Sequence, residues 1–298
     1  MKRKLRMFGI GLGVILILFS LLTFTTERIN QAREKKVMLG FETLLDREDV
    51  AIGEVIQYVN QNIDTVSKEN AAKLVRGIER VHKASLPQWE KKFENEALQR
   101  ELARIYLEND WSLDDFSDIR DQKLRTIVEE AIAGGYKVET AEGFFFPVID
   151  YDFYYQYHQA VTPDLAAYLE IMAVESDRTP VKDAALMISW EEILKRALRQ
   201  EEFIKEYAAS EQVEAVQGLL KRYVTFALFG CNNTPLFSYD TMKMKPEAKA
   251  AYLKHSWDEK QGSFSALMKE YLKVLAENDY RLSEEVGEFR KKAAESFN

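Results

Sequence analysis

The sequence predicts a mainly α-helical protein in which a single N-terminal transmembrane helix precedes a multi-helix extracytoplasmic domain with one β-hairpin. Three observations support this fold class. Apolar residues recur at the spacing of amphipathic helices along most of the 298-residue chain. Only six prolines and thirteen glycines interrupt it. An uncharged, largely apolar stretch occupies residues 7–26. The chain is 46% hydrophobic and 30% charged, which is typical of a folded protein.

The apolar stretch at residues 7–26 predicts the membrane anchor. Its twenty residues would form a helix about 30 Å long, which matches the hydrocarbon core of a bilayer. The basic residues at 1–6 predict a cytoplasmic tail and leave residues 27–298 outside a single-pass cell-membrane protein. Two alternatives stay open: a cleaved signal peptide, although the sequence around Thr26 is a poor cleavage site, and a buried helix of a soluble protein.

The anchor also carries a possible self-association motif. Gly9 and Gly13 have the G-x-x-x-G spacing that lets two membrane helices approach closely, as in a homodimer. Glycine is also simply common in membrane helices, and that reading stands beside the first.

Charge and cysteine content exclude several classes of site. Four of the 41 basic residues lie in residues 1–6, and the remaining 37 are opposed by 49 acidic residues, a net charge of −12. Such an acidic body argues against nucleic acid as a partner, because phosphate binding needs a basic face. Cys231 is the single cysteine, which excludes an internal disulfide and a cysteine-based metal site. We expect no cofactor and no metal.

The first helices follow the anchor in order. Residues 27–48 are predicted to form a helical stalk, and residues 49–298 an α-rich domain, either single or in two helical lobes that meet at residues 136–160. Within this domain we predict helices over Val50–Val59, after Ser67, from Ser85-Leu86-Pro87 through Tyr106, and from a capping box at Ser112 and Asp115 to Gly134-Gly135.

A β-hairpin is predicted at about residues 136–149. Tyr136–Thr140 and Phe144–Ile149 are rich in β-formers and flank a short turn that ends in Gly143. Pro147 cannot donate a ladder hydrogen bond, which predicts an edge strand. Both faces of the second strand are apolar, so we expect burial on both sides.

Helices return after the hairpin. We predict helix starts at Thr162-Pro163, at the capping box Ser189–Glu192, at Ser210, and at Pro246, Ser263 and Ser283. The segment Cys231–Pro235 is predicted to be a loop after a helix that ends at Gly230. His82 and His255 lie among charged residues and are expected to be exposed.

The segment Gly143–His158 is the chemically distinctive part of the chain, because half of its sixteen residues are Phe or Tyr. Its first half is predicted to attach the hairpin to the helices. Its second half predicts a binding surface that combines aromatic, acidic and imidazole groups. The candidate binding residues are Asp150, Tyr151, Asp152, Tyr154, Tyr155, Tyr157 and His158. Asp150, Asp152 and His158 could also hold a metal, but an aspartate at a strand-to-helix junction more often caps the helix.

One catalytic candidate rests on a resemblance. Glu175-Ser176, followed by Pro180 and Leu186-Met187, resembles the Glu-Ser motif of lytic transglycosylases. The resemblance covers thirteen residues and lacks that family's Gly-Leu-Met-Gln stretch. It implies that Glu175 acts as acid and base on a cell-wall glycan.

Taken together, these features predict a membrane-anchored extracytoplasmic protein that acts by binding or scaffolding at the cell envelope rather than as an enzyme. Its expected partners are the lipid bilayer, through residues 7–26, and an envelope protein or cell-wall polymer. The alternative is a lytic-transglycosylase-like enzyme that uses Glu175.

Overall fold

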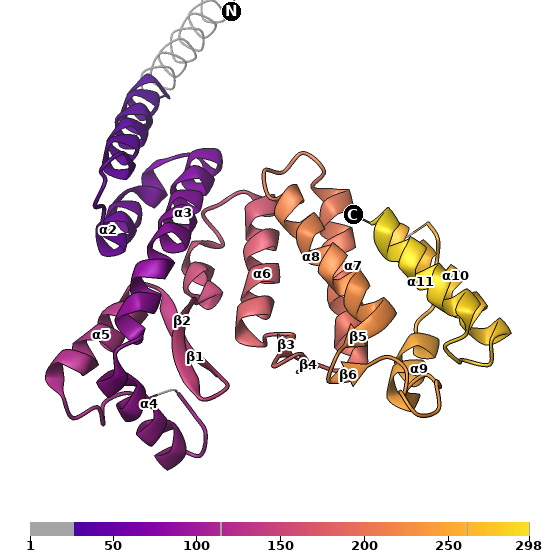
Figure 1. The fold of residues 1–298 in the computed structure, drawn as a ribbon. Coiled ribbons are helices and arrows are strands. Elements are labelled where there is room, and N and C mark those ends of the chain that lie inside the picture. Colours follow the sequence, from indigo (N-terminus) through magenta and orange to yellow (C-terminus); the bar gives the residue numbers. More distant parts are fainter. Residues whose placement is uncertain (1–26, 114, 261, 298) are drawn as a thin grey trace, which may run out of the picture. The chain divides into compact units, whose positions relative to one another are not determined.

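A computed structural model of the chain describes residues 27–113, 115–260 and 262–297. The chain divides into two compact units, one formed by residues up to Ser85 with Ala160–Thr162, and one formed by Leu86–Gln159 with Pro163–Asn298. Both units consist mainly of helices, as predicted (Figure 1). One boundary between the units falls inside a helix, between Ser85 and Leu86, and two others flank Ala160–Thr162.

None of the helices in these described ranges is long and apolar enough to cross a membrane. The predicted tail at residues 1–6 and the predicted anchor at residues 7–26, including Gly9 and Gly13, lie outside them. The anchor therefore stays a prediction.

The first unit contains a helix over residues 27–45, α2 (Ile52–Asn62), the short 3-10 helix η1 (Ile63–Thr65) and most of α3 (Lys68–Phe93). Its helices meet closely at Gly77, where a Cβ atom would lie 2.4 Å from the ring of Phe41. His82 is buried, so its predicted exposure is wrong. Helical spacing explains this, because His82 follows the buried Ile78 by four residues and shares its face.

Helix α3 continues through Pro87, where the sequence predicted a new helix start. Proline inside a helix removes one backbone hydrogen bond and costs about 3 kcal/mol. Burial of Trp89 and Phe93 on the far side of the proline offsets this cost. The actual break comes at Asn95, whose side chain accepts from the backbone N–H groups of Ala97 (2.9 Å) and Leu98 (3.1 Å) and so begins α4 (Glu96–Glu108).

Helix α5 (Gln122–Ala133) begins later than predicted, because Asp121 caps it by accepting from the N–H groups of Lys123 and Leu124. Asp115 instead accepts from the N–H of Ser117 at 2.8 Å, in a turn before the helix, so the predicted capping box is wrong. At the other end, Gly135 has a φ of +80°. The predicted left-handed glycine after the helix is therefore confirmed.

The predicted hairpin is confirmed as β1 (Tyr136–Ala141) paired antiparallel with β2 (Phe144–Ile149). Ala141 pairs with Phe144, and the two turn residues between them both have positive φ, which is typical of a type I′ turn. Pro147 lies in an edge strand, because the sheet has two strands. Burial of β2 is one-sided, however. Phe145 and Pro147 are buried on one face, while on the other face Phe144 is exposed and Phe146 and Val148 are half-buried, so the expected full burial of both faces is wrong.

The outer edge of β2 is covered by a side chain from α4. The Gln99 amide accepts from the N–H of Phe145 at 2.9 Å and donates to the carbonyl of the same residue at 2.7 Å. It thereby fills the place of a neighbouring strand.

The rest of the second unit is helical, with two very short hairpins. In order it contains η2 (Tyr151–Tyr157), α6 (Pro163–Asp177), β3 (Val181–Lys182), β4 (Ala185–Leu186), α7 (Trp190–Glu206), α8 (Val213–Phe229), β5 (Gly230–Cys231), β6 (Thr234–Pro235), α9 (Pro246–Lys254), α10 (Ser263–Glu277) and α11 (Glu284–Ser296). The predicted caps Ser189 and Ser283 are confirmed. The predicted loop at 231–235 instead contains the β5–β6 hairpin.

Helix α7 is the centre of this part, since it contacts α6, α8, α9 and α10 (Figure 1). Its buried face joins a large apolar core with the helices that follow it. Its fully buried members include Ile193, Leu194, Ala197, Tyr223, Tyr252, Phe264, Met268 and Tyr271. Helix α7 also contacts α6, and both helices supply residues to the sites below.

Candidate functional site

The aromatic segment after the hairpin forms the 3-10 helix η2, and its period decides which tyrosines are accessible. Asp150 caps this helix by accepting from the N–H of Asp152 at 3.2 Å. A 3-10 helix has three residues per turn, so Tyr151, Tyr154 and Tyr157 lie on one face. All three are buried, and Tyr151 stacks on Tyr154 with 5.4 Å between ring centroids. The expectation that these three tyrosines face water is therefore wrong.

A second face of η2 points to solvent. Tyr155 follows Asp152 by one turn and precedes His158 by one turn, and its side chain is 77% exposed. Its ring lies beside the imidazole of His158, with 5.7 Å between centroids and an interplanar angle of 37°. The two rings together present an aromatic and an imidazole group on this face of η2.

This face of η2 borders a cavity of about 260 Å³, which we call the Tyr155 groove. Aromatic and charged residues from η2, α6 and α7 line it: Tyr151, Tyr155, His158, Glu170 and Arg199. Leu169, Ala173 and Val174 of α6 supply its apolar lining. Ser176 holds η2 on α6, because its hydroxyl accepts from the N–H of Tyr151 at 3.2 Å.

Ion pairs order the polar groups of the groove. Glu170 bonds through one carboxylate oxygen to the Arg199 guanidinium, and its other oxygen lies 3.1 Å from Nε2 of His158. Glu170 and Arg199 are each 43% exposed. Glu170 and Arg199 carry opposite charges and pair with each other, so the groove offers donors and acceptors that are held in place by an ion pair.

The structure thus brings together three of the seven predicted binding residues, Tyr151, Tyr155 and His158. Tyr154 and Tyr157 belong to the buried face, Asp150 caps the helix, and Asp152 donates its backbone N–H to that cap. In the described ranges no three His, Cys, Asp or Glu residues form a group that could hold a metal ion. Sequence reasoning missed Glu170 and Arg199. They lie on separate helices, and no local spacing indicates that they meet.

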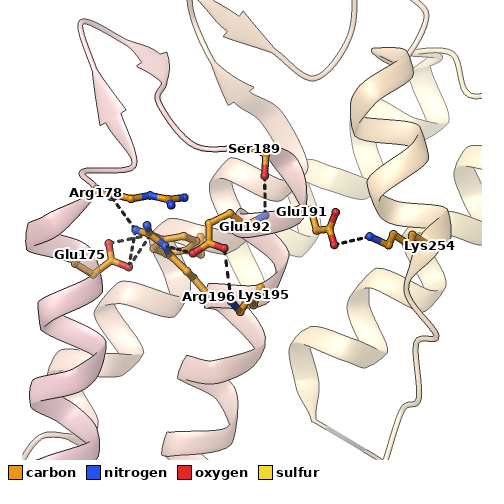
Figure 2. Close-up of polar contacts among 9 residues, drawn as sticks. Glu175, Arg178, Ser189, Glu191, Glu192, Lys195, Arg196 and Lys254 are labelled. Atoms are coloured by element: carbon orange, nitrogen blue, oxygen red, sulfur yellow. Dashed lines mark hydrogen bonds and ion pairs between the residues drawn. The ribbon is translucent and has the colours of Figure 1, made fainter.

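Glu175, the catalytic candidate, belongs to a second and buried polar cluster between α6, α7 and α8 (Figure 2). The Tyr223 hydroxyl lies 2.6 Å and 2.8 Å from the two carboxylate oxygens of Glu175. Arg196 lies 3.5 Å from the same carboxylate and donates to Glu192 at 3.0 Å and to the carbonyl of Arg178 at 2.9 Å. The Glu175 and Arg196 side chains are only 10% and 4% exposed.

Burial raises the pKa of Glu175 above its ordinary value of 4.5, although the Tyr223 hydrogen bond and the positive charge of Arg196 oppose this. Burial also raises the pKa of Tyr223, which therefore stays a hydrogen-bond donor. A raised carboxyl pKa suits a general acid, but a general acid must also reach its substrate. Glu175 lines neither the Tyr155 groove nor the cavity along the C-terminal half of α7. Its geometry favours a structural role.

Comparison of the chain with protein-family models, curated proteins and solved structures finds no match.

Proposed function

We propose that the chain is a membrane-anchored, extracytoplasmic binding module of the cell envelope, and that the Tyr155 groove is its ligand site. The uncharged stretch at residues 7–26, preceded by four basic residues, supports the anchor and its orientation. The acidic body supports a partner other than nucleic acid.

The observation that carries the proposal is the meeting of three separate elements at one accessible cavity. Tyr155 comes from η2 and His158 follows directly at its C-terminal end, whereas Glu170 comes from α6 and Arg199 from α7. An apolar lining with a few convergent polar groups is the usual composition of a ligand site. An exposed ring at its rim supplies contact area at low entropic cost, because a tyrosine has only two rotatable side-chain bonds.

Substitution of Tyr155 tests the groove. Crosslinking of the full chain in intact membranes should capture the same ligand with the wild type and with the control Tyr239→Ala, which removes another exposed tyrosine, 68% accessible, outside the groove. Tyr155→Ala should lose this capture while its thermal unfolding stays unchanged, since exposed substitutions typically alter stability by less than about 0.5 kcal/mol. Equal capture by Tyr155→Ala and wild type would refute the groove as the ligand site.

Carbonate extraction tests the anchor. The full chain should remain with the membrane pellet, because a transmembrane helix resists the release that removes peripheral proteins. Release into the soluble fraction would exclude the anchored part of the proposal and leave the groove untouched.

The second candidate is a glycan-cleaving enzyme that uses Glu175, and the raised pKa of this buried carboxyl is the observation in its favour. The full chain would release new reducing or anhydro ends from purified cell-wall glycan, and Glu175→Gln would abolish this activity. Absence of cleavage by the wild type excludes it.

A further inference from the structure

The Tyr155 groove offers one exposed ring beside a set of neutralised polar groups, and from this we infer that its ligand is a neutral saccharide unit. The inference rests on the proposed binding function and names the chemical class that the groove selects. Size, charge and hydrogen-bonding pattern each support it.

The size of the groove fits a single ring. Its volume of about 260 Å³ lies just below the range of about 300–1,000 Å³ that is usual for small-molecule sites. Tyr155 is the one strongly exposed ring among the lining residues, whereas Tyr151 is buried to 5% exposure. One aromatic platform can stack against the C–H face of one sugar ring, and the apolar atoms of Ala173 and Val174 can contact the same ligand.

The charge of the groove favours a neutral ligand. Glu170 and Arg199 neutralise each other, and a charged ligand would lose hydration without gaining an unpaired opposite charge. A neutral ligand leaves this ion pair intact. The remaining cost is the desolvation of the ligand hydroxyl groups, and hydrogen bonds from the ion pair to these hydroxyls can offset it.

The hydrogen-bonding groups of the groove match neighbouring hydroxyls. The Glu170 carboxylate accepts, the Arg199 guanidinium donates, and one ring nitrogen of His158 lies 3.1 Å from Glu170. A hydroxyl is both donor and acceptor, so two adjacent hydroxyls can bridge a carboxylate and a guanidinium. These groups are already held by one another, which lowers the entropic cost of ordering them.

A peptide ligand fits less well. Peptides are usually bound by strand addition at a sheet edge, by insertion of a helix into a long apolar groove, or as an extended helix on several aromatic ridges. The groove is built from three helices, has a small apolar lining and presents one exposed ring.

Titration calorimetry on the full chain tests the inference, in a detergent that carries no sugar headgroup. The probes are cellotriose and chitotriose as neutral oligosaccharides, and trigalacturonate as a charged one. We expect saturable binding of a neutral probe and weaker or no binding of trigalacturonate. Tyr155→Ala should weaken binding about tenfold, which corresponds to the stacking energy of about 1.4 kcal/mol that an aromatic face can supply.

Two further variants make the readout specific to the groove. Tyr155→Phe should retain binding, because it keeps the ring face. Arg199→Met should lose binding, because it removes the guanidinium that donates a hydrogen bond to a ligand hydroxyl. Tyr239→Ala should bind like the wild type. Tighter binding of trigalacturonate, or sugar binding that is insensitive to Tyr155→Ala, would overturn the inference.

Failure of this inference is distinguishable from failure of the proposed function. If no sugar binds but crosslinked capture still depends on Tyr155, the saccharide assignment is wrong and the binding function stands. If neither sugar binding nor capture depends on Tyr155, both fall.

Discussion

Two glutamate–arginine pairs join the same two helices, α6 and α7, yet their surroundings are opposite. Glu170 pairs with Arg199 at the groove, where both side chains are 43% exposed. Glu175 pairs with Arg196 about one helical turn away along each helix, where the side chains are 10% and 4% exposed. Residue type and helix partners are shared, so burial is what separates the two sites.

The buried pair needs more hydrogen-bond partners than the exposed pair. The buried pair has recruited further partners, since Tyr223, Glu192 and the carbonyl of Arg178 all bond to it (Figure 2). Charges removed from water need such partners, because the desolvation cost exceeds what one ion pair returns. The exposed pair has its charges partly hydrated and can exchange a water for a ligand hydroxyl. The first pair is suited to holding helices together, and the second to recognition.

The largest effect should come from breaking the buried pair. Arg196→Met should lower the free energy of unfolding by about 3–5 kcal/mol, because it leaves Glu175 and Glu192 without their buried cation. Urea denaturation followed by circular dichroism measures this. The matched control Arg199→Met should cost less than about 1 kcal/mol, as exposed pairs do. Equal losses for the two variants would remove the distinction drawn between the pairs.

A smaller effect should follow from removing the hydroxyl that binds Glu175. Tyr223→Phe keeps the buried ring and deletes only the donor to both carboxylate oxygens, so we expect a loss of about 1–3 kcal/mol. Tyr155→Phe on the exposed face of η2 is the control and should not alter the urea midpoint. An unchanged midpoint for Tyr223→Phe would show that Glu175 is satisfied by other groups.

Glu175→Gln should change how the free energy of unfolding varies with pH. Because the pKa of Glu175 is raised in the folded chain, the folded state holds this proton more tightly than the unfolded state. Its contribution is present below pH 4.5 and is lost as the pH rises through the folded pKa. The stability of the wild type relative to Glu175→Gln should therefore fall as the pH rises above 4.5.

A control with the opposite sign is available in the same unit. The hydrogen bond from Lys254, with its charge, lowers the pKa of Glu191, so the contribution of Glu191 is lost as the pH falls. Glu191→Gln should alter the profile at low pH and in the opposite direction. Parallel profiles for wild type and Glu175→Gln between pH 4 and 7 would contradict the raised pKa.

The smallest effect should come from Glu170→Gln. We expect a change in unfolding free energy of less than about 1 kcal/mol, which shrinks further with added salt because the pair with Arg199 is exposed. Urea titrations at low and high ionic strength measure it. A larger, salt-insensitive loss would place Glu170 with the structural residues and weaken its role in the groove.

Local signals in the sequence were enough for most of the fold. Ser189 and Ser283 begin their helices as predicted, and the glycine turn sets the register of β1 and β2. Errors arose where two signals competed. At Pro87 the apolar periodicity of α3 outweighed the proline, and the helix continues to Phe93. The break comes where the side chain of Asn95 caps the start of α4.

The candidate site was predictable only in part. The repeat of tyrosines at 151, 154 and 157 is a three-residue period, and reading it as a 3-10 helix would have separated the buried tyrosines from Tyr155. Glu170 and Arg199 are different. Their meeting depends on how α6 packs against α7, and a single sequence does not encode that contact in any short pattern.

The contact between Gln99 and the hairpin has a consequence for self-association. Apart from Pro147, the stretch Phe144–Ile149 is hydrophobic, uncharged and strand-forming, which is typical of segments that recruit identical strands into aggregates. An incoming strand would dock on the outer edge of β2. There Gln99 already occupies the backbone groups of Phe145, and Pro147, two residues along the same edge, has no N–H to offer. Gln99 and Pro147 thus block the addition of a further strand. Their substitution should first increase turbidity on storage, before it lowers the melting temperature.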